Sequence, residues 1–408
     1  MKNFSTFITE QKNTHMTHIE DKVLYGGVNG TRQAILALRS LRDMLKGTHQ
    51  GSTSVKWDGA PAVFAGIDPT DGKFFVAKKG IFNKNPKVYK TEAEVDEDTS
   101  GDLATKLKQA LKYLPSLGIK GVVQGDFLFS KADLKNETID GDDYVTFHPN
   151  TIVYAVPANT PMSKDIKSAQ IGIVWHTTYT GSTFESMKAS YGVDVTKFKK
   201  SATVWSQDAM LKDLTSATMS KSDTDEVTKY LSDAGKLFNQ ISSSTLRELE
   251  ANRELAVIIE TFNNSFVRQG QMVTNTKAHV DALIRFVKNK YQKEIDKLKT
   301  EKGKAGKIAK MNELLKFFSP ANKANLKKMF DLQKIIILAK LKIINILGKL
   351  SKIKTFLKTK NGFKTTGQEG YVAIDKLGGD AVKIVDRMEF SYANFSPDIL
   401  KGWDSPTR

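Results

Sequence analysis

The sequence predicts an α+β fold in which a β-rich core is interrupted by a large helical insertion. Short strand-like runs, separated by Gly, Pro and Asp turns, fill most of the chain from Ser52 to about Thr183. From there to about Leu357 the apolar residues recur at helical spacing, and strand-like runs return after Gln368. A core that is split by an insertion explains this return most simply. We therefore divide the chain into core residues 1–190, a helical insertion at 191–358 and core residues 359–408.

The core is expected to begin with a packing helix at residues 29–46. Ile35, Leu38, Leu41 and Leu45 fall on one face of this segment, and Gly47 is a suitable stop. A second amphipathic helix is predicted from Asp102. The predicted strands lie at 52–59, 60–67, 73–80, 121–129, 144–157, 170–180, 369–375 and 381–390. In this arrangement Lys56 sits at the start of a hairpin.

The insertion is expected to contain long helices. Residues 244–267 and 280–300 have 3.6-residue spacing, and a flexible break is predicted around Gly303 and Gly306. The apolar run at 332–357 contains too many lysines for a membrane span, which needs about 18 uninterrupted apolar residues. A buried or groove-lining helix is favoured there over a membrane-surface helix.

The composition excludes several classes of chemistry. The 408 residues include no cysteine, which rules out disulfide-linked partners, thiolate metal sites and Cys nucleophiles. The first twenty residues lack the apolar core of a signal peptide. These features predict a soluble protein with no membrane partner, located in a cytoplasm, which would be the host cytoplasm if the chain is phage-encoded.

The positive charge is concentrated in one segment. Residues 271–360 hold 23 Lys and Arg against 6 Asp and Glu, a net charge of +17, so the rest of the chain is neutral overall. This pattern predicts a surface that binds a polyanion, with nucleic acid (RNA or DNA) favoured and an acidic membrane second.

Familiar catalytic motifs are absent, apart from one lysine motif. The sequence has no phosphate-binding Gly-rich loop ending in Gly-Lys-Ser/Thr, no His-Glu-x-x-His and no Gly-x-Ser-x-Gly. Its six histidines lack metal-ligand spacing, and His148 and His176 are interpreted as structural. The segment "KWDG" at Lys56–Gly59 is K-x-D-G, which is weak evidence alone because its chance occurrence in such a chain is roughly one in ten.

Five further segments of the chain accompany this lysine motif. In order along the chain they are "VAKKGIF" at 76–82, "VVQGDFLF" at 122–129, "IGIVWHTTY" at 171–179, "QEGYVAID" at 368–375 and "AVKIVD" at 381–386. The ordered series resembles motifs I, Ia, III, IIIa, IV and V of the covalent nucleotidyltransferases, the superfamily of ATP-dependent DNA and RNA ligases and mRNA capping enzymes. The resemblance implies a nucleotidyltransferase core of antiparallel sheets with helices.

The resemblance also assigns the reacting groups. It implies that Lys56 attacks the α-phosphorus of ATP to give lysyl-AMP, which requires an uncharged amine. Asp58 and Gly59 would fix the approach of this lysine, with glycine allowing the backbone to come close to the nucleotide. Lys383 would neutralise charge on the transferred phosphate.

The remaining segments would hold the nucleotide and a metal ion. Lys79 with Gly80 would contact ribose or phosphate, and Trp175 would stack on adenine. Asp126 would lie near the ribose or a metal-bound water, and Glu369 would bind Mg²⁺ or Mn²⁺. Each of these residues has a structural alternative, such as a core role for Trp175 or a solvated surface role for Lys56 and Lys383.

The chain also departs from the superfamily pattern. Asp126 stands where glutamate is usual, Ala60-Pro61-Ala62 replaces the basic residue that often follows K-x-D-G, and Val385 takes the place of a second motif V lysine, for which Arg387 is a possible substitute. About 20 residues follow motif V, too few for an OB-fold, which favours an RNA-ligase-like or divergent phage-type enzyme.

Three functions follow from these observations. The first is an ATP-dependent polynucleotide ligase that joins RNA or nicked DNA, with the basic insertion as a clamp. A GTP-using capping-type guanylyltransferase shares the lysine chemistry. A nucleic-acid-binding or virion-associated protein on a degenerate nucleotidyltransferase fold is the non-enzymatic alternative.

Overall fold

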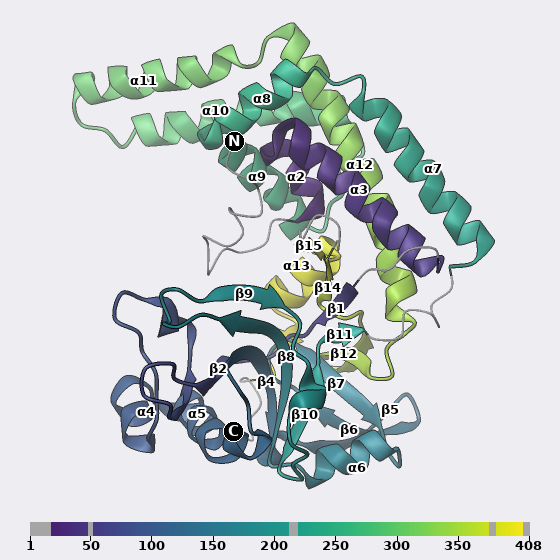
Figure 1. Ribbon diagram of the computed structural model, residues 1–408. Coiled ribbons are helices and arrows are strands. Elements are labelled where there is room, and N and C mark those ends of the chain that lie inside the picture. Colours follow the sequence, from purple (N-terminus) through teal and green to yellow (C-terminus); the bar gives the residue numbers. More distant parts are fainter. Residues whose placement is uncertain (1–17, 48–51, 212–218, 375–380, 403–408) are drawn as a thin grey trace.

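A computed structural model describes residues 18–47, 52–211, 219–374 and 381–402 (Figure 1). The fold is mixed α+β: a body of three largely antiparallel sheets lies below a helical unit (Figure 1). The coarse fold class predicted from the sequence is therefore confirmed.

The first sheet joins the two parts of the chain that flank the helices. Its order is β11-β1-β14-β15, with every pair antiparallel. The bounds are Ser52–Lys56 for β1, Met210–Leu211 for β11, Gly370–Ile374 for β14 and Ala381–Ile384 for β15. Because β1 pairs with β14, the K-x-D-G segment lies beside a segment more than 300 residues away.

The second sheet forms the middle of the body. Its order is β10-β8-β4-β2-β3, with β9 added on β8, and only the β10–β8 pair is parallel. The bounds are Ala62–Ile67 for β2, Phe74–Ala77 for β3, Val122–Ser130 for β4, Ile171–Thr180 for β8, Lys188–Tyr191 for β9 and Val204–Asp208 for β10. Helix α5 (Gly101–Tyr113) buries Leu107 and Ala110 in one core with Val63, Phe127 and Trp175 of this sheet. The short helix α4 (Glu92–Asp98) precedes it.

The third sheet also draws on both parts of the chain. Its order is β13-β12-β7-β6-β5, with β16 added on β12. The bounds are Lys135–Ile139 for β5, Asp142–Phe147 for β6, Ile152–Pro157 for β7, Lys354–Thr359 for β12, Gly362–Thr365 for β13 and Ile399–Leu400 for β16. Helices α6 (Pro161–Ser168) and α13 (Arg387–Phe395) accompany it. Short 3₁₀ helices lie at Ile19–Asp21, Lys79–Phe82, Leu114–Leu117, Lys131–Asp133 and Val195–Lys197.

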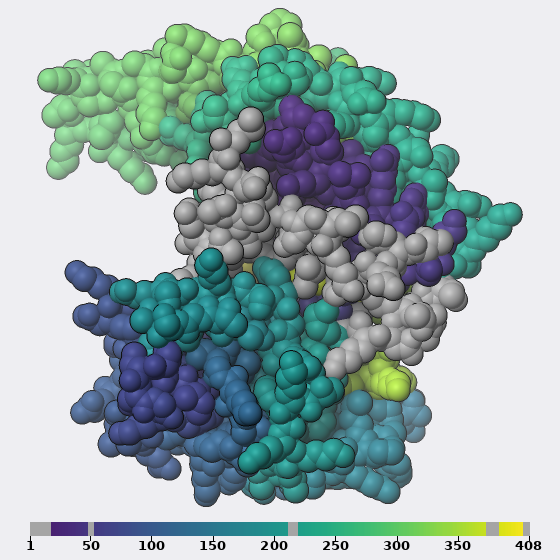
Figure 2. All heavy atoms as spheres, viewed as in Figure 1, coloured from purple at the N-terminus to yellow at the C-terminus, as the bar shows by residue number. Residues whose placement is uncertain are grey.

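The helical unit has one hydrophobic core, which also takes in Val55, Tyr371 and Ile384 of the first sheet. Its helices are α2 (Lys22–Tyr25), α3 (Gly27–Leu45), α7 (Lys221–Phe238), α8 (Ser243–Ala251), α9 (Arg253–Arg268), α10 (Thr276–Ile295), α11 (Glu301–Lys316) and α12 (Pro320–Gly348). Leu38 of α3 shares this core with Leu231, Ile259 and Ile336. Helices α10 and α11 form a hairpin that stands out from the unit as an arm, and Figure 2 shows open space between this arm and the sheet body.

Several sequence-based expectations need correction. Residues 188–211 were expected to be helical but form β9, β10 and β11, so the helices of the insertion begin at Lys221. Helix α3 has the expected buried face, but it packs in the helical unit and not on the sheets. Gly303 and Gly306 lie inside α11, whose N-cap is Thr300, so the chain turns before them.

Two further expectations concern single segments. Strands β1 and β2 do not pair with each other, so Lys56 does not start a hairpin: the chain crosses there from the first sheet to the second. The apolar run at 332–357 forms the end of α12, with Ile336, Ile343 and Leu347 buried, followed by β12. In the described part of the chain, no helix is long and apolar enough to cross a membrane.

Candidate active site

Lys56 and Glu369 meet where β1 and β14 run side by side. Lys56 is the last residue of β1 and pairs with Gly370, so Glu369 immediately precedes the partner strand. The Lys56 Nζ atom donates a hydrogen bond to Oε1 of Glu369 and forms an ion pair with it. The Glu369 side chain is 9% exposed and that of Lys56 is 31% exposed. The lysine is therefore held at the edge of the protein interior and is not free in bulk water.

The pKa of Glu369 shows the strength of this burial. Burial raises the pKa of its carboxyl to about 7, although the Lys56 ammonium acts against the rise. Asp58 adds a smaller increase, and Lys383 a smaller decrease. A carboxyl with this pKa gains and loses a proton near neutral pH.

Asp126 and His176 come to Lys56 from the second sheet. Burial raises the pKa of Asp126 to about 7, opposed by the charges of Lys56 and Lys79, and burial lowers the pKa of His176 to about 4, helped by Lys56. His176 Nε2 lies 3.8 Å from Oδ2 of Asp126. The imidazole is thus neutral at pH 7 and sits in the same electrostatic environment as the lysine.

Lys383 of β15 lies in the same electrostatic environment as Lys56 and Glu369. It pairs with Val372 of β14, and burial followed by the charge of Lys56 lowers the pKa of its amine. Glu369 acts in the opposite direction. Two lysines and two high-pKa carboxyls from four strands or their ends therefore surround one point.

Asp58 anchors the K-x-D-G segment. Its Oδ2 accepts hydrogen bonds from the backbone N–H groups of Thr151 (2.7 Å) and Ile152 (2.9 Å), and its Oδ1 accepts one from the Asn150 side chain (2.6 Å). Its own N–H donates to the Tyr154 hydroxyl at 2.7 Å. Asp58 therefore fixes the segment to the start of β7, which makes it a positioning residue for Lys56.

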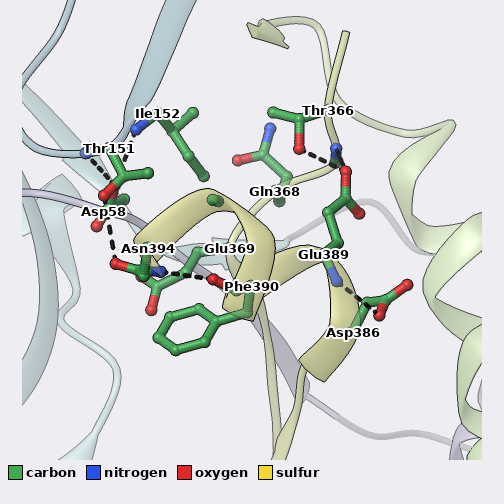
Figure 3. A pocket seen from close by; sticks show the side chains of 12 residues that line it. Asp58, Thr151, Ile152, Thr366, Gln368, Glu369, Asp386, Glu389, Phe390 and Asn394 are labelled. Atoms are coloured by element: carbon green, nitrogen blue, oxygen red, sulfur yellow. Dashed lines mark hydrogen bonds between the residues drawn. The ribbon is translucent and has the colours of Figure 1, made fainter. Parts of the chain in front are cut away.

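A small cavity adjoins this anchor. Both Asp58 and Glu369 line it (Figure 3). Its opposite wall comes from the start of α13, where Glu389 accepts hydrogen bonds from Thr366 and from the N–H of Gly367 (Figure 3). Phe390 also lines this cavity, and its ring centroid lies 5.5 Å from Lys383 Nζ.

Gly59 and Gly80 differ in how closely other residues approach them, and Lys79 lies at the surface near Asp126. A Cβ atom on Gly59 would lie 2.5 Å from Cβ of Asp126, so only glycine allows this contact between the lysine segment and β4. Gly80 meets no such contact, since its nearest neighbour would be Lys87 Cβ at 3.4 Å. Lys79 is exposed, yet close enough to Asp126 for its charge to lower that pKa.

Trp175 lies on the wrong face of its strand for contact with a nucleotide. It is 0% exposed, its Nε1 donates to Ser206 Oγ at 2.9 Å, and its ring packs edge-on against Phe198. The register between β4 and β8 skips His176, which lies at a β-bulge. Burial and the charge of Lys56 lower the pKa of His176, so its ring lies near Lys56. From the sequence His176 was interpreted as structural, and its local pattern gave no sign of the bulge.

Val385, at the position of the second motif V lysine, and its possible substitute Arg387 both have structural roles. Val385 is fully buried, and Arg387 donates two hydrogen bonds to Asp21 and one to Asn264. The Arg387 guanidinium is thus hydrogen-bonded to residues of the helical unit. Lys383 is the motif V cation that the structure brings to Lys56.

The carboxyls fit a hard divalent cation that is bound together with a substrate. Mg²⁺ is commonly held by one or two carboxylates plus waters and substrate phosphates. Glu369 and Asp126 supply two such groups beside Lys56. Within the described residues, no group of three or more His, Asp or Glu side chains is arranged to hold a metal ion.

Comparison with known proteins places the chain in one family. The model of a family of unknown function, DUF6267, matches residues 13–398. The chain belongs to DUF6267. No curated protein and no solved structure matches it. In this member of DUF6267, the residues around Lys56 are the best candidates for a functional site.

Proposed function

We propose that the chain is an ATP-dependent polynucleotide ligase that acts through a lysyl-AMP intermediate on Lys56. One observation carries the proposal: the Lys56 amine, at the junction of two sheets, is ion-paired with Glu369 and lies in the electrostatic field shared by Asp126, His176 and Lys383. Perturbed carboxyl and amine pKa values around a lysine are typical of catalytic sites. The order of these residues along the chain is that of the superfamily motifs.

The first step would form lysyl-AMP. The Lys56 Nζ attacks the α-phosphorus of ATP, an N–P bond forms, the bond from that phosphorus to the bridging oxygen breaks, and pyrophosphate leaves. The ammonium must first lose a proton. Glu369 is in hydrogen-bond contact with Nζ and has a pKa near 7, so its carboxylate is placed to accept that proton.

The later steps would transfer AMP and seal the strand. An oxygen of a 5′-phosphate end attacks the same phosphorus and releases the lysine, and a 3′-hydroxyl then attacks the end phosphate and releases AMP. Lys383 and Lys79 are the cations available to stabilise charge on the phosphates. His176, neutral at pH 7, has the position and the ring for contact with the base.

Glu369 and Asp126 would hold Mg²⁺ or Mn²⁺. Such an ion, when bound, would screen the negative charge of the triphosphate. Because burial raises the pKa of both carboxyls to about 7, their affinity for the ion should rise with pH up to about 7 and change little above it.

The α10–α11 arm would contact the nucleic acid. Six of its lysines are exposed, and no ion pair involves them within the described residues: Lys277, Lys288, Lys293, Lys297, Lys299 and Lys302. Other lysines of the same arm, such as Lys307, are paired with Glu294. The unpaired lysines are free to neutralise backbone phosphates, and RNA is favoured over nicked DNA.

Covalent labelling tests the proposal. Purified protein is stripped with pyrophosphate and incubated with α-labelled ATP or GTP and Mg²⁺ or Mn²⁺. We expect label from ATP that survives denaturation in the wild type, and none in Lys56→Ala or Lys56→Arg. Lys56→Arg is the sharper control, because it keeps the charge facing Glu369 and removes only the nucleophile. Absence of label under all metal conditions would overturn the enzymatic proposal.

Two other outcomes correspond to the rival functions. Label from GTP alone would indicate a capping-type guanylyltransferase. Nucleic-acid binding without label would indicate a non-catalytic or virion-associated protein on a degenerate fold. The buried Val385 in place of a second lysine, together with the shorter Asp126, favours this last alternative over capping.

A further inference from the structure

Helix α13 carries two aromatic side chains that face solvent. Tyr392 is 40% exposed and Phe395 is 66% exposed, the highest value among the exposed large apolar side chains of the described residues. The two residues are three positions apart on one helix, so they are neighbours on the same face. Apolar side chains that are exposed singly are normal, but an adjacent exposed pair is a candidate contact surface.

A cation lies over each of the two rings. Lys364 Nζ, from β13, is 4.4 Å from the centroid of the Tyr392 ring. The Cζ atom of Arg268, at the end of α9, is 5.9 Å from the centroid of the Phe395 ring. Both cations are exposed, and no ion pair involves either of them within the described residues. Because a cation–π contact at an exposed site is weak, both are free to exchange the ring for a phosphate.

The strands next to α13 are positively charged. Residues 351–368, which include β12 and β13, hold five lysines and no acidic residue. Two of these lysines pair with carboxylates of the third sheet, whereas Lys352, Lys360 and Lys364 are exposed and form no ion pair in the part of the chain that the structure describes. Strand β12 shares a small hydrophobic core with α13, which sets this charge close to the aromatic pair.

The carboxylates of α13 and its N-cap are engaged by other groups. Asp386 accepts hydrogen bonds from two backbone N–H groups of the first turn. Glu389 accepts hydrogen bonds from Thr366 and from the N–H of Gly367 on the wall of the cavity beside Asp58. The exposed Asp398 follows the end of the helix, and the three unpaired lysines outnumber it.

Another face of α13 reaches the Lys56 site. Phe390 lines the cavity that Asp58 and Glu369 also line, and its ring centroid lies 5.5 Å from Lys383 Nζ (Figure 3). The nine residues of α13 span about 13 Å, and the helix lies between the helical unit and the sheet body (Figure 1). The exposed aromatic pair is therefore a short distance from the cavity beside Lys56.

We propose that Tyr392 and Phe395 form a stacking platform for a single-stranded segment of nucleic acid, with Lys364 and Arg268 contacting its phosphates. Every base has a π-face that can stack on an exposed aromatic ring, while nearby cations track the backbone. The bases of a duplex are already stacked on one another, so the platform selects unpaired strands. The choice of partner rests on the proposed function, and the platform would hold a strand end beside the Lys56 site.

The two cations distinguish nucleic acid from an apolar protein partner. A protein that covered the rings with an apolar surface would also bury Lys364 and Arg268 without a countercharge, which is costly. A nucleic acid supplies a stacking surface and a countercharge together.

Fluorescence anisotropy of a short labelled single-stranded RNA, measured without ATP, tests the platform. Tyr392→Ala and Phe395→Ala should each weaken binding roughly 5- to 100-fold and leave the salt dependence unchanged, because stacking involves no counterion release. Lys364→Ala should instead reduce the slope of log affinity against log salt concentration by about 0.7, the value for one phosphate contact on a single strand. Leu36→Ala, at a position 48% exposed on α3, should change neither quantity. Binding of the same RNA as a duplex should not depend on the two aromatic residues.

A tryptophan at Phe395 gives a direct readout of stacking. Phe395→Trp keeps an aromatic ring, so it should retain the wild-type affinity that Phe395→Ala loses. The fluorescence of the added indole should be quenched when the RNA binds. Leu36→Trp is the matched control, and the RNA should leave the fluorescence that it adds unchanged.

Several results would overturn the platform. They are no binding of the RNA to the wild type, unchanged affinity in both alanine variants, and equal quenching in Phe395→Trp and Leu36→Trp. Self-association of the wild type that Phe395→Ala abolishes, measured by light scattering, would show that this face contacts a second copy of the chain and would also overturn it.

These results are separable from a failure of the ligase proposal. A chain that is labelled on Lys56 but whose RNA affinity ignores both aromatic residues would contradict the platform alone. A chain that takes no label but whose RNA affinity depends on Tyr392 and Phe395 would contradict the ligase alone and support the platform.

Discussion

The Glu369 and Asp126 carboxyls are the clearest sign of an unusual site at the scale of single residues. Both have a pKa raised to about 7, chiefly by burial, although the positively charged Lys56 lies beside them. Buried carboxyls normally find hydrogen-bond donors in the protein, as Asp58 does with three. The raised pKa values of Glu369 and Asp126 mean that burial of their charged forms costs folding free energy near neutral pH.

Replacing Asp126 by asparagine tests this cost. In the folded protein its pKa is raised from 3.8 to about 7, so folding takes up a proton between these values. The wild type should then lose stability as the pH rises from about 4 to about 7, with little further loss above. Asp126→Asn should be more stable than the wild type by about 4 kcal/mol at pH 8, an advantage that disappears near pH 4.

Urea denaturation of both proteins at pH 4, 6 and 8 would measure this difference. Asp140→Asn, at a turn residue between β5 and β6, serves as the control for an Asp-to-Asn change. A stability gap that stays constant with pH would contradict the raised pKa of Asp126.

At the scale of single elements, two neighbouring residues of strand β8 lie in different environments. Its residue Trp175 points into the core with Phe127 and Leu107, whereas the next residue, His176, shares the environment of Lys56 and Asp126. A β-bulge at His176 accompanies this difference between two residues that are adjacent in the sequence.

The two positions should respond differently to substitution. Trp175→Phe removes the hydrogen bond to Ser206 and part of the core volume, so unfolding free energy should fall by about 1–3 kcal/mol with ATP affinity unchanged. His176→Ala should leave stability nearly unchanged and weaken ATP binding roughly 5- to 100-fold, the range for loss of one base–aromatic stacking contact. His176→Phe should restore most of that affinity. Equilibrium ATP binding and thermal melting of all three variants would decide between this assignment and a nucleotide contact by Trp175.

The elements themselves were largely predictable from the sequence, but their pairing was not. The period-2 runs predicted β2, β4 and β8, and the helical face of Leu38 and Leu41 predicted α3. Nothing in the local pattern indicated that α3 packs with helices 200 residues away, or that β1 and β2 belong to different sheets. Such pairings depend on contacts between distant segments, which local periodicity does not encode.

The residues of the candidate site were likewise predictable only in part from the sequence. The motif series named Lys56, Asp126, Glu369 and Lys383, and the structure brings these four residues together. It could not distinguish Trp175 from His176, because the β-bulge at His176 is not visible in the local sequence. It also could not reveal that the Asp58 carboxylate accepts hydrogen bonds from the backbone of Thr151 and Ile152, because these residues, at the start of β7, belong to no motif.

The distribution of charge is the main feature at the scale of the whole molecule. The excess of +17 resides in residues 271–360, and the α10–α11 arm at 276–316 holds 12 Lys and Arg against 5 Asp and Glu of this segment. The arm stands off from the sheet body (Figure 2). Ion pairs such as Lys342 with Asp223 and Glu226 reduce the number of cations free to meet phosphates. The free cations, and not the formal charge, should set the affinity for nucleic acid.

The salt dependence of RNA binding tests whether the α10–α11 arm contacts nucleic acid. We expect the logarithm of the affinity for a labelled single-stranded RNA to fall linearly with the logarithm of the salt concentration, and the triple variant with alanine at Lys288, Lys293 and Lys299 to reduce that slope by about 2. A matched variant with alanine at Lys120, Lys164 and Lys167, three exposed lysines of the sheet body, has the same change in net charge. Fluorescence anisotropy between 50 and 200 mM salt measures both slopes. Equal effects of the two triple variants would exclude a specific role for the arm.

The pairing of β1 with β14 has a consequence for biosynthesis. Lys56 emerges early from the ribosome, but Glu369 follows 313 residues later, which at about 5–20 residues per second is a delay of roughly 15–60 s. During that interval β1 lacks the neighbour that completes its sheet, and helix α3 likewise waits for α7 and α12. The nascent chain therefore cannot bring Lys56 to Glu369 until translation is nearly over, so under the proposed function a half-made polypeptide would lack the site at which AMP is attached.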